Sequence, residues 1–160
     1  MLSYLNSNPA ITATLVLLIS IILTYIGWKV IYSNAKRITS RNETYGLITH
    51  MFKLTDDLLK EATDYWLTPV PNTNHILHAK NFELKITSLS NTLQLITSRD
   101  INVNFSLNLR RLRRAVTLDA ERVTTVSDAI KALKIEDMNY HSSELKINIL
   151  KSFDLKHPRD

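Results

Sequence analysis

One uninterrupted apolar run dominates the N-terminal part of the chain. Residues 1–28 carry no charged side chain, and within them the segment Ala10–Trp28 reads AITATLVLLISIILTYIGW. About twenty helical residues cross the ~30 Å hydrocarbon core of a bilayer. Trp28 and Tyr32 stand at the end of the run, and aromatic side chains favour the membrane–water interface. The pattern therefore predicts one transmembrane helix, within a membrane anchor over residues 1–33.

Beyond the apolar run, apolar residues recur every three or four positions, which is the spacing of a helix. Ser40 and Glu43 form a capping-box pattern, so we expect a helix to start there. The sequence TPVPN at 68–72 should end it, because proline lacks the backbone amide that a helix needs. A second helix is expected over about 74–97, followed by a polar loop at 98–104.

A third helical pattern begins at Phe105. Its apolar positions are Leu109, Leu112, Val116, Val123, Val126, Ile130 and Leu133. Asp119 interrupts this seam, so a break is expected there. Ser142 and Ser143 offer caps for a last helix, which should reach about Phe153.

The supply of turn-forming residues decides the fold class. The 160 residues include two glycines and four prolines, whereas sheets need many tight turns built from such residues. We therefore predict an all-α protein, in which the N-terminal transmembrane helix is followed by a compact domain of antiparallel helices over 34–157 and a frayed tail at 158–160. Residues 83–86 and 146–149 alternate apolar and polar side chains, so a short strand also fits them.

Positive charges lie on one side of the apolar run. Lys29, Lys36, Arg37 and Arg41 follow it, and no basic residue precedes it. Cytoplasmic flanks carry the excess of lysine and arginine in membrane proteins. We expect a single-pass protein of the inner (cytoplasmic) membrane, with its N-terminus outside and its helical domain in the cytoplasm.

Small side chains recur along the expected span. Ala13, Ser20, Thr24 and Gly27 fall on one side of a helix, and we call them the small-residue face. Such faces let helices approach closely in lipid, which predicts a homo-oligomer. A stripe of this kind also arises by chance in a threonine-rich span, so both interpretations stand.

Four arginines lie within five positions of the third helical pattern. Arg110, Arg111, Arg113 and Arg114, the arginine cluster, have no acidic residue three or four positions away. Exposed helices usually pair opposite charges at those spacings. Guanidinium groups bind phosphate in a bidentate manner, so the cluster is a candidate anion site.

Asn102 and Asn104 precede the arginines, where free amides at a helix start would add to the positive field. Arg122 is set apart, because Asp119 lies three residues before it and is its expected partner. The alternative is a solvated basic surface, or a set of salt bridges to acids on another helix. Those acids are Asp56, Asp57 and Glu61.

Catalytic and metal chemistry find little support. The chain has no cysteine, which excludes disulfides and thiolate metal sites. His75 and His78 lack a nearby third ligand, and neither a phosphate-binding glycine loop nor a nucleophile elbow occurs. We expect no enzyme, no metal and no cofactor. The net charge of +5 favours anionic partners, although no long nucleic acid is expected.

This combination resembles the small membrane effectors associated with type III CRISPR systems. The resemblance rests on the span Ala10–Trp28, a helical domain of about 120 residues and the arginine cluster, and on no short motif. It implies a cytoplasmic domain that binds cyclic tetra-adenylate through the cluster, and a homo-oligomer, by resemblance a tetramer, that acts at the membrane in antiviral defence. The commoner cyclic-oligoadenylate sensors use a doubly wound α/β fold, and no alternating strand–helix pattern occurs here.

Two other functions fit the same features. One is a membrane-anchored scaffold whose basic helical surface docks a protein partner. The other is a surface binder whose arginines contact anionic lipid headgroups. A specific nucleotide should raise the thermal stability of a sensor and leave that of a scaffold unchanged.

Overall fold

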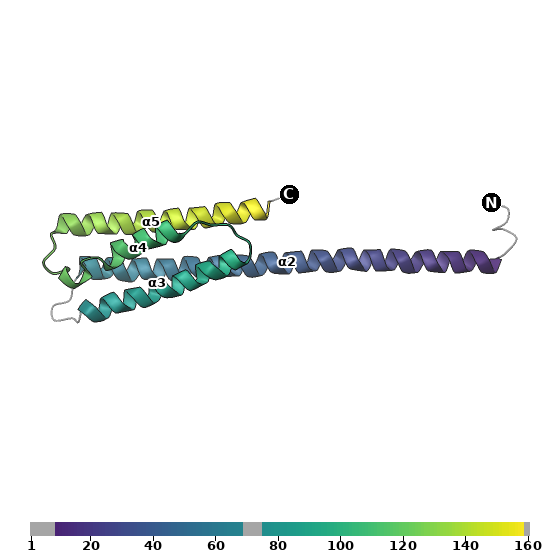
Figure 1. Cartoon of the computed structure of the whole chain (residues 1–160), viewed down its shortest axis with the longest axis horizontal. Coiled ribbons are helices and arrows are strands. Elements are labelled where there is room, and N and C mark those ends of the chain that lie inside the picture. The colour runs from purple at the N-terminus through teal and green to yellow at the C-terminus, as the bar shows by residue number, and fades with distance from the viewer. Residues whose placement is uncertain (1–8, 69–74, 159–160) are drawn as a thin grey trace. The chain divides into compact units, whose positions relative to one another are not determined.

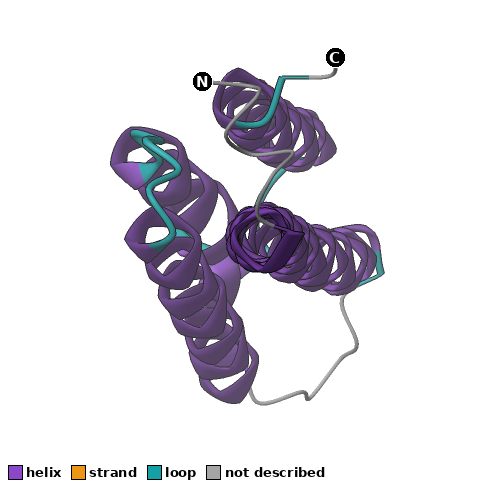
Figure 2. Ribbon diagram, turned by 90° about the vertical axis from the view of Figure 1, so that its right-hand side faces the viewer, coloured by secondary structure: helices purple, strands orange, loops and turns teal. Residues whose placement is uncertain are grey.

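A computed structural model describes residues 9–68 and 75–158 of the chain (Figure 1). The described residues form α2 (Pro9–Leu67), α3 (His75–Ser98), α4 (Ser106–Thr117), the 3-10 turn η1 (Ala120–Arg122) and α5 (Asp128–Lys156). No strand occurs in this part of the chain (Figure 2). The all-α prediction is confirmed, and the two segments that also fitted a strand are helical.

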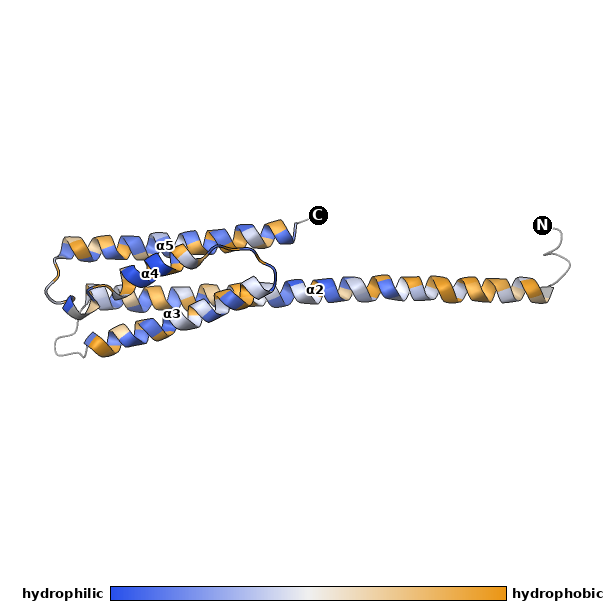
Figure 3. Cartoon of the chain, in the orientation of Figure 1, coloured by the Kyte–Doolittle hydropathy of each residue, from blue (hydrophilic) through white to orange (hydrophobic). Residues whose placement is uncertain are grey.

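The chain divides into two units, Met1–Asn42 and Glu43–Asp160, and α2 contributes to both. In the first unit every side chain from 10 to 42 is exposed. Many of them are large and apolar (Figure 3). Among the described helices, only α2 is long and apolar enough to cross a membrane.

The hydroxyl groups of this segment are compatible with hydrocarbon. Those of Thr14, Ser20 and Thr24 each donate to the carbonyl four residues earlier, at 2.8–2.9 Å. A polar group in lipid needs an internal partner, and these bonds provide it. The segment thus combines an exposed apolar surface with satisfied polar groups, as a lipid-facing helix requires.

The helix start expected at Ser40 was wrong. Helix α2 continues through Ser40 and Glu43, with no glycine or proline between Trp28 and Tyr45 to stop it. Glu43 instead pairs with Arg99 at 2.6 Å. The end of the helix was predicted correctly, because α2 ends at Leu67, immediately before the TPVPN sequence. Residues 69–72 themselves lie outside the described residues.

The second unit is held together by one apolar core. All four helices contribute, together with the loop after α3. The largest fully buried side chains are Ile48, Met51, Leu58, Trp66, Phe82, Leu89, Leu93, Ile96, Ile101, Leu112, Met138 and Leu145. The buried side of α3 follows the three-and-four spacing of a helix and carries Phe82, Ile86, Leu89, Thr92, Leu93 and Ile96. The predicted start of this helix at Asn74 lies outside the described residues, and its end at Ser98 and the loop that follows are as expected.

The break predicted at Asp119 is present. Helix α4 ends at Thr117, and Asp119 adopts the left-handed conformation with φ 63°. Lys134 of α5 reaches back to the Asp119 carboxylate at 3.2 Å. The Tyr65 hydroxyl, from the end of α2, donates to the Ala120 carbonyl at 2.6 Å. A side-chain contact from each neighbouring helix thus fixes the turn that follows α4.

Two expectations for the last helix were wrong. Helix α5 starts at Asp128, so Ser142 and Ser143 lie inside it, and the Ser142 hydroxyl donates to the Asn139 carbonyl. The seam expected through Ile130 and Leu133 is also not buried, since these side chains are 47% and 60% exposed. The turn after α4 resets the helical phase. The buried side of α5 carries other residues: Met138, Ser142, Leu145, Ile149 and Phe153.

Asp100, just after α3, offers a test of the backbone. It has φ 58°, a conformation that costs most L-residues about 1–2 kcal/mol. Its side chain is 93% exposed and lies 3.5 Å from Lys156, so removal of the carboxylate should cost little stability. We predict that Asp100→Gly leaves the unfolding midpoint of the full-length protein in detergent unchanged or raises it, and that Asp100→Val lowers it, measured by circular dichroism. Equal midpoints for both variants would argue against the left-handed turn.

Candidate functional site: an arginine-lined groove on α4

The orientation of α4 follows from its apolar side. The buried residues of this twelve-residue helix are Asn108, Leu112, Ala115 and Val116, and Leu109 is partly buried against the core. All four arginines of the cluster are consequently exposed. The helix carries no acidic residue at all.

The arginine cluster divides into two pairs on α4. At 100° per residue, Arg110 and Arg113 lie on the side nearer α3, and Arg111 and Arg114 lie on the side nearer α5. Each pair of arginines lines a different groove. The groove between α3 and α4 is lined by Arg110 and Arg113, whereas the groove between α4 and α5 is lined by Arg111 and Arg114.

The groove between α3 and α4, which we call the α3–α4 groove, has a volume of about 420 Å³. Its floor is apolar and its walls carry hydroxyl groups. The apolar residues are Ile86, Phe105 and Leu109, and the hydroxyl residues are Thr87, Ser90 and Ser106. Arg110 and Arg113 stand beside it and also line an adjoining depression with Arg114. Apolar area next to a few polar groups is the composition of a small-molecule site.

The charges of the cluster are only partly balanced within the chain. Arg113 Nη2 binds Glu83 Oε1 of α3 at 2.8 Å. Arg110, Arg111 and Arg114 make no ion pair with any residue in 9–68 or 75–158. These residues therefore retain uncompensated positive charge.

Two of the acids that were alternative partners for the cluster are bound elsewhere. Asp56 pairs with Lys146, and Glu61 pairs with Lys85. An anion in the groove would offset the positive charge that remains on Arg110.

Asn102 and Asn104 lie in the loop before α4 and do not line the groove. The side-chain oxygen of Asn104 accepts from Ser106 Oγ at 3.0 Å, and the Asn102 carbonyl accepts from Ser152 Oγ at 3.1 Å. Both side chains are exposed. The start of α4 at Phe105 has no side-chain cap, so its first amides remain directed at the loop.

The pair expected between Arg122 and Asp119 does not form. Asp119 binds Lys134 instead, because the left-handed turn at Asp119 directs its carboxylate toward α5. Arg122 is exposed and makes no ion pair with the described residues. It also lies outside the α3–α4 groove.

His75 and His78 have structural contacts at the start of α3. His75 Nδ1 lies 2.8 Å from the Tyr65 hydroxyl, and the His78 ring stacks on the Tyr65 ring with centroids 5.1 Å apart. No group of three or more potential metal ligands occurs in the part of the chain that is described. The histidines thus help to hold the end of α2 against α3.

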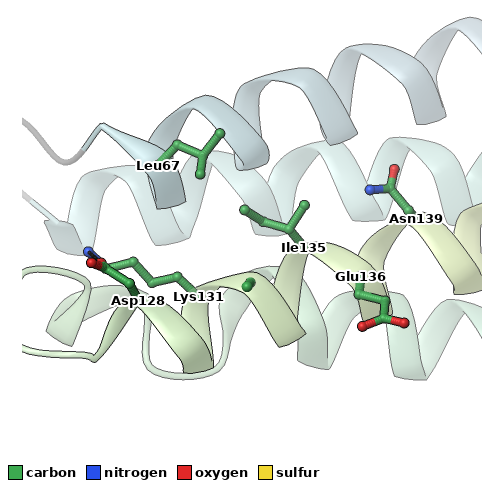
Figure 4. Close-up of a pocket in the computed structure, with 7 residues that line it drawn as sticks. Leu67, Asp128, Lys131, Ile135, Glu136 and Asn139 are labelled. Atoms are coloured by element: carbon green, nitrogen blue, oxygen red, sulfur yellow. Dashed lines mark hydrogen bonds and ion pairs between the residues drawn. The ribbon is translucent and has the colours of Figure 1, made fainter.

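A larger cavity, of about 720 Å³, lies between the end of α2 and the first half of α5. Ile135 and Asn139 project to the side on which Leu67 lies, and Glu136 projects away from it (Figure 4). The one basic residue there, Lys131, binds Asp128 at 3.2 Å. With no free cation, this cavity is a poor site for an anion.

The small-residue face of α2 is exposed along its length. Ala13, Ser20, Thr24 and Gly27 are all accessible, and a Cβ atom added at Gly27 would meet no atom within 4 Å. Packing of this face against a second span stays a prediction.

Several residues of the groove were not anticipated from the sequence. Leu109 was expected only as an apolar position of the third helical pattern, and Thr87 and Ser90 received no role. One signal was present, because Glu83, Thr87 and Ser90 follow a spacing of four and three and share one side of α3.

No family model, curated protein or solved structure matches the chain.

Proposed function

We propose that this chain is a membrane-anchored, non-enzymatic sensor whose cytoplasmic helical domain binds a phosphodiester second messenger in the α3–α4 groove. The observation that carries the proposal is the uncompensated charge of Arg110 beside an apolar groove, with Arg114 in the adjoining depression. The proposed ligand is cyclic tetra-adenylate, which the resemblance to CRISPR-associated membrane effectors suggests. Binding would be transmitted to the membrane as part of antiviral defence.

The groove offers a separate contact for each part of a nucleotide. Arg110 and Arg113 suit the phosphate, since guanidinium forms bidentate bonds with its oxygens. Phe105 and Leu109 offer an apolar surface for the base, and the hydroxyl groups on the wall suit the ribose. The volume of about 420 Å³ lies within the range of ~300–1,000 Å³ typical of ligand pockets. One subunit would then hold one nucleotide, and a four-fold assembly would hold the ring.

Glu83 acts in this scheme as an internal competitor for the phosphate. Its carboxylate occupies Arg113 when the ligand is absent, and both side chains are half exposed. A phosphodiester, which carries the same single negative charge, can displace it at little cost, because exposed ion pairs contribute at most about 1 kcal/mol.

The membrane anchor is supported by the exposed apolar surface of α2. A soluble monomer rarely exposes a contiguous apolar patch larger than a few hundred Å², and every residue from 10 to 28 is exposed here. The bilayer is the environment that buries such a surface on all sides of a helix.

The arginines give the first test. Arg110→Ala and Arg113→Ala should each weaken binding of cyclic tetra-adenylate by about tenfold or more, because a hydrogen bond to a charged group contributes ~1.5–3 kcal/mol. Calorimetric titration of the full-length protein in detergent measures this. Arg122→Ala is the matched control and should bind as the wild type does. Absence of binding at micromolar ligand would reject the nucleotide and leave a scaffold function.

Glu83→Gln should act in the opposite direction. Loss of the competing carboxylate should tighten binding of cyclic tetra-adenylate in the same titration. Unfolding stability should fall by less than about 1 kcal/mol, because the pair with Arg113 is exposed. Weaker binding in this variant would show that the carboxylate contacts the ligand directly.

The topology can be tested independently of any ligand. A reporter fused after Asp160 should show cytoplasmic activity, because Lys29, Lys36, Arg37 and Arg41 all follow the span. Replacing these four residues with uncharged ones should reduce the preference for a cytoplasmic C-terminal domain. A periplasmic signal from the unaltered sequence would place the domain away from any cytoplasmic messenger.

A further inference from the structure

The other arginine pair borders a second groove, between α4 and α5, with a volume of about 330 Å³. We call it the α4–α5 groove. Three large apolar side chains line it and remain accessible: Leu118 is 43%, Ile130 47% and Leu133 60% exposed. No described element of the chain covers them. Exposed apolar side chains that gather in one groove mark an interaction surface.

The two helices run antiparallel along this groove. Lys134, near the start of α5, contacts the Leu118 carbonyl at the end of α4. Near the end of α5, Ser152 contacts the Asn102 carbonyl in the loop before α4. The C-terminal end of α4 therefore lies beside the beginning of α5. Arg114, one turn before Leu118, is consequently level with Asp137, one turn after Lys134.

The rims of the groove carry opposite charges. The α4 rim has Arg111 and Arg114, which lack an ion pair with the described residues. The α5 rim has Asp137, which likewise has no ion pair there, and two turns farther Glu144, 3.8 Å from His141. Lys134, between the rims, is neutralised by Asp119. The result is an apolar floor between a positive rim and a negative rim.

This arrangement is self-complementary, and we infer that the α4–α5 groove is the contact surface for a second copy of this chain. A two-fold axis parallel to α4 and α5 places the α4 rim of one copy on the α5 rim of the other. Such an axis leaves each residue at the same height along the helices, so Arg114 meets the partner's Asp137, and the three apolar side chains cover their counterparts. A two-fold axis across the helices would instead oppose arginine to arginine, which the charges disfavour.

The contact is small, and the proposed membrane anchor would assist it. Copies held in one membrane meet at a high effective concentration, which lets a modest surface pair. The inference adds to the proposed function a second role for the cluster: Arg110 and Arg113 serve the ligand, and Arg114 serves the subunit contact. Its test below uses no nucleotide, so the two proposals fail separately.

The absence of cysteine from the chain permits a direct test by cross-linking. Full-length Arg114→Cys and Asp137→Cys proteins are mixed in detergent and oxidised. A disulfide needs Cα atoms about 4.4–6.8 Å apart, so it reports close contact. The mixture should give a several-fold higher yield of disulfide dimer than Arg114→Cys alone. Exposed Ser88 on α3 supplies the control, and Ser88→Cys mixed with Asp137→Cys should give little dimer. Equal yields in all mixtures, or a dominant Arg114→Cys homodimer, would overturn the inference.

A charge exchange supplies the second test. Arg114→Glu should weaken self-association by about tenfold or more, because it faces the partner's Asp137 with a like charge. Adding Asp137→Arg to the same chain should restore self-association, because the positive and negative residues have then exchanged rims. Sedimentation of the full-length protein across a dilution series in detergent gives both affinities. Failure of the double variant to recover, with helicity intact, would contradict the paired rims.

Discussion

Burial of one side of α4 is the constraint on which both grooves depend. A twelve-residue helix is marginal in water by itself, so the packing of Leu112, Ala115 and Val116 in the core is what keeps it folded. That packing leaves every arginine of the cluster on the outside. Mutual repulsion of the arginines is tolerated because the core holds the helix, and the uncompensated charge is then available to a ligand or a second subunit.

The features that were predictable from the sequence are those set by local chemistry. The span follows from an apolar run without charge, and the end of α2 follows from the prolines after Leu67. The buried seam of α3 follows from three-and-four spacing. The exposed position of the arginines also follows, because it needs only the phase of one helix. The outward side of α4 was therefore predictable from the sequence. The residues of α3 and α5 that line the two grooves with it were not.

The errors arose where distant contacts outweigh a local signal. The capping box at Ser40 was overridden because nothing stops the helix that precedes it. Ile130 and Leu133 keep helical spacing with α4, but the turn at Asp119 resets the phase and exposes them. The pair of Arg113 with Glu83 spans thirty residues of sequence and becomes visible only once α3 packs beside α4. Both grooves are products of such packing, so their lining could not be predicted.

The central claim is that the arginine cluster serves two surfaces, with Arg110 and Arg113 facing a ligand. Nuclear magnetic resonance of the arginine side-chain Nε–H groups tests it most directly, in full-length protein in detergent with each signal assigned by a single Arg→Lys variant. On addition of cyclic tetra-adenylate, the account predicts large shifts for Arg110 and Arg113, and small shifts for Arg111 and for Arg122. Equal shifts for all of these arginines, as diffuse attraction of an anion would produce, or no shift at saturating ligand, would contradict it.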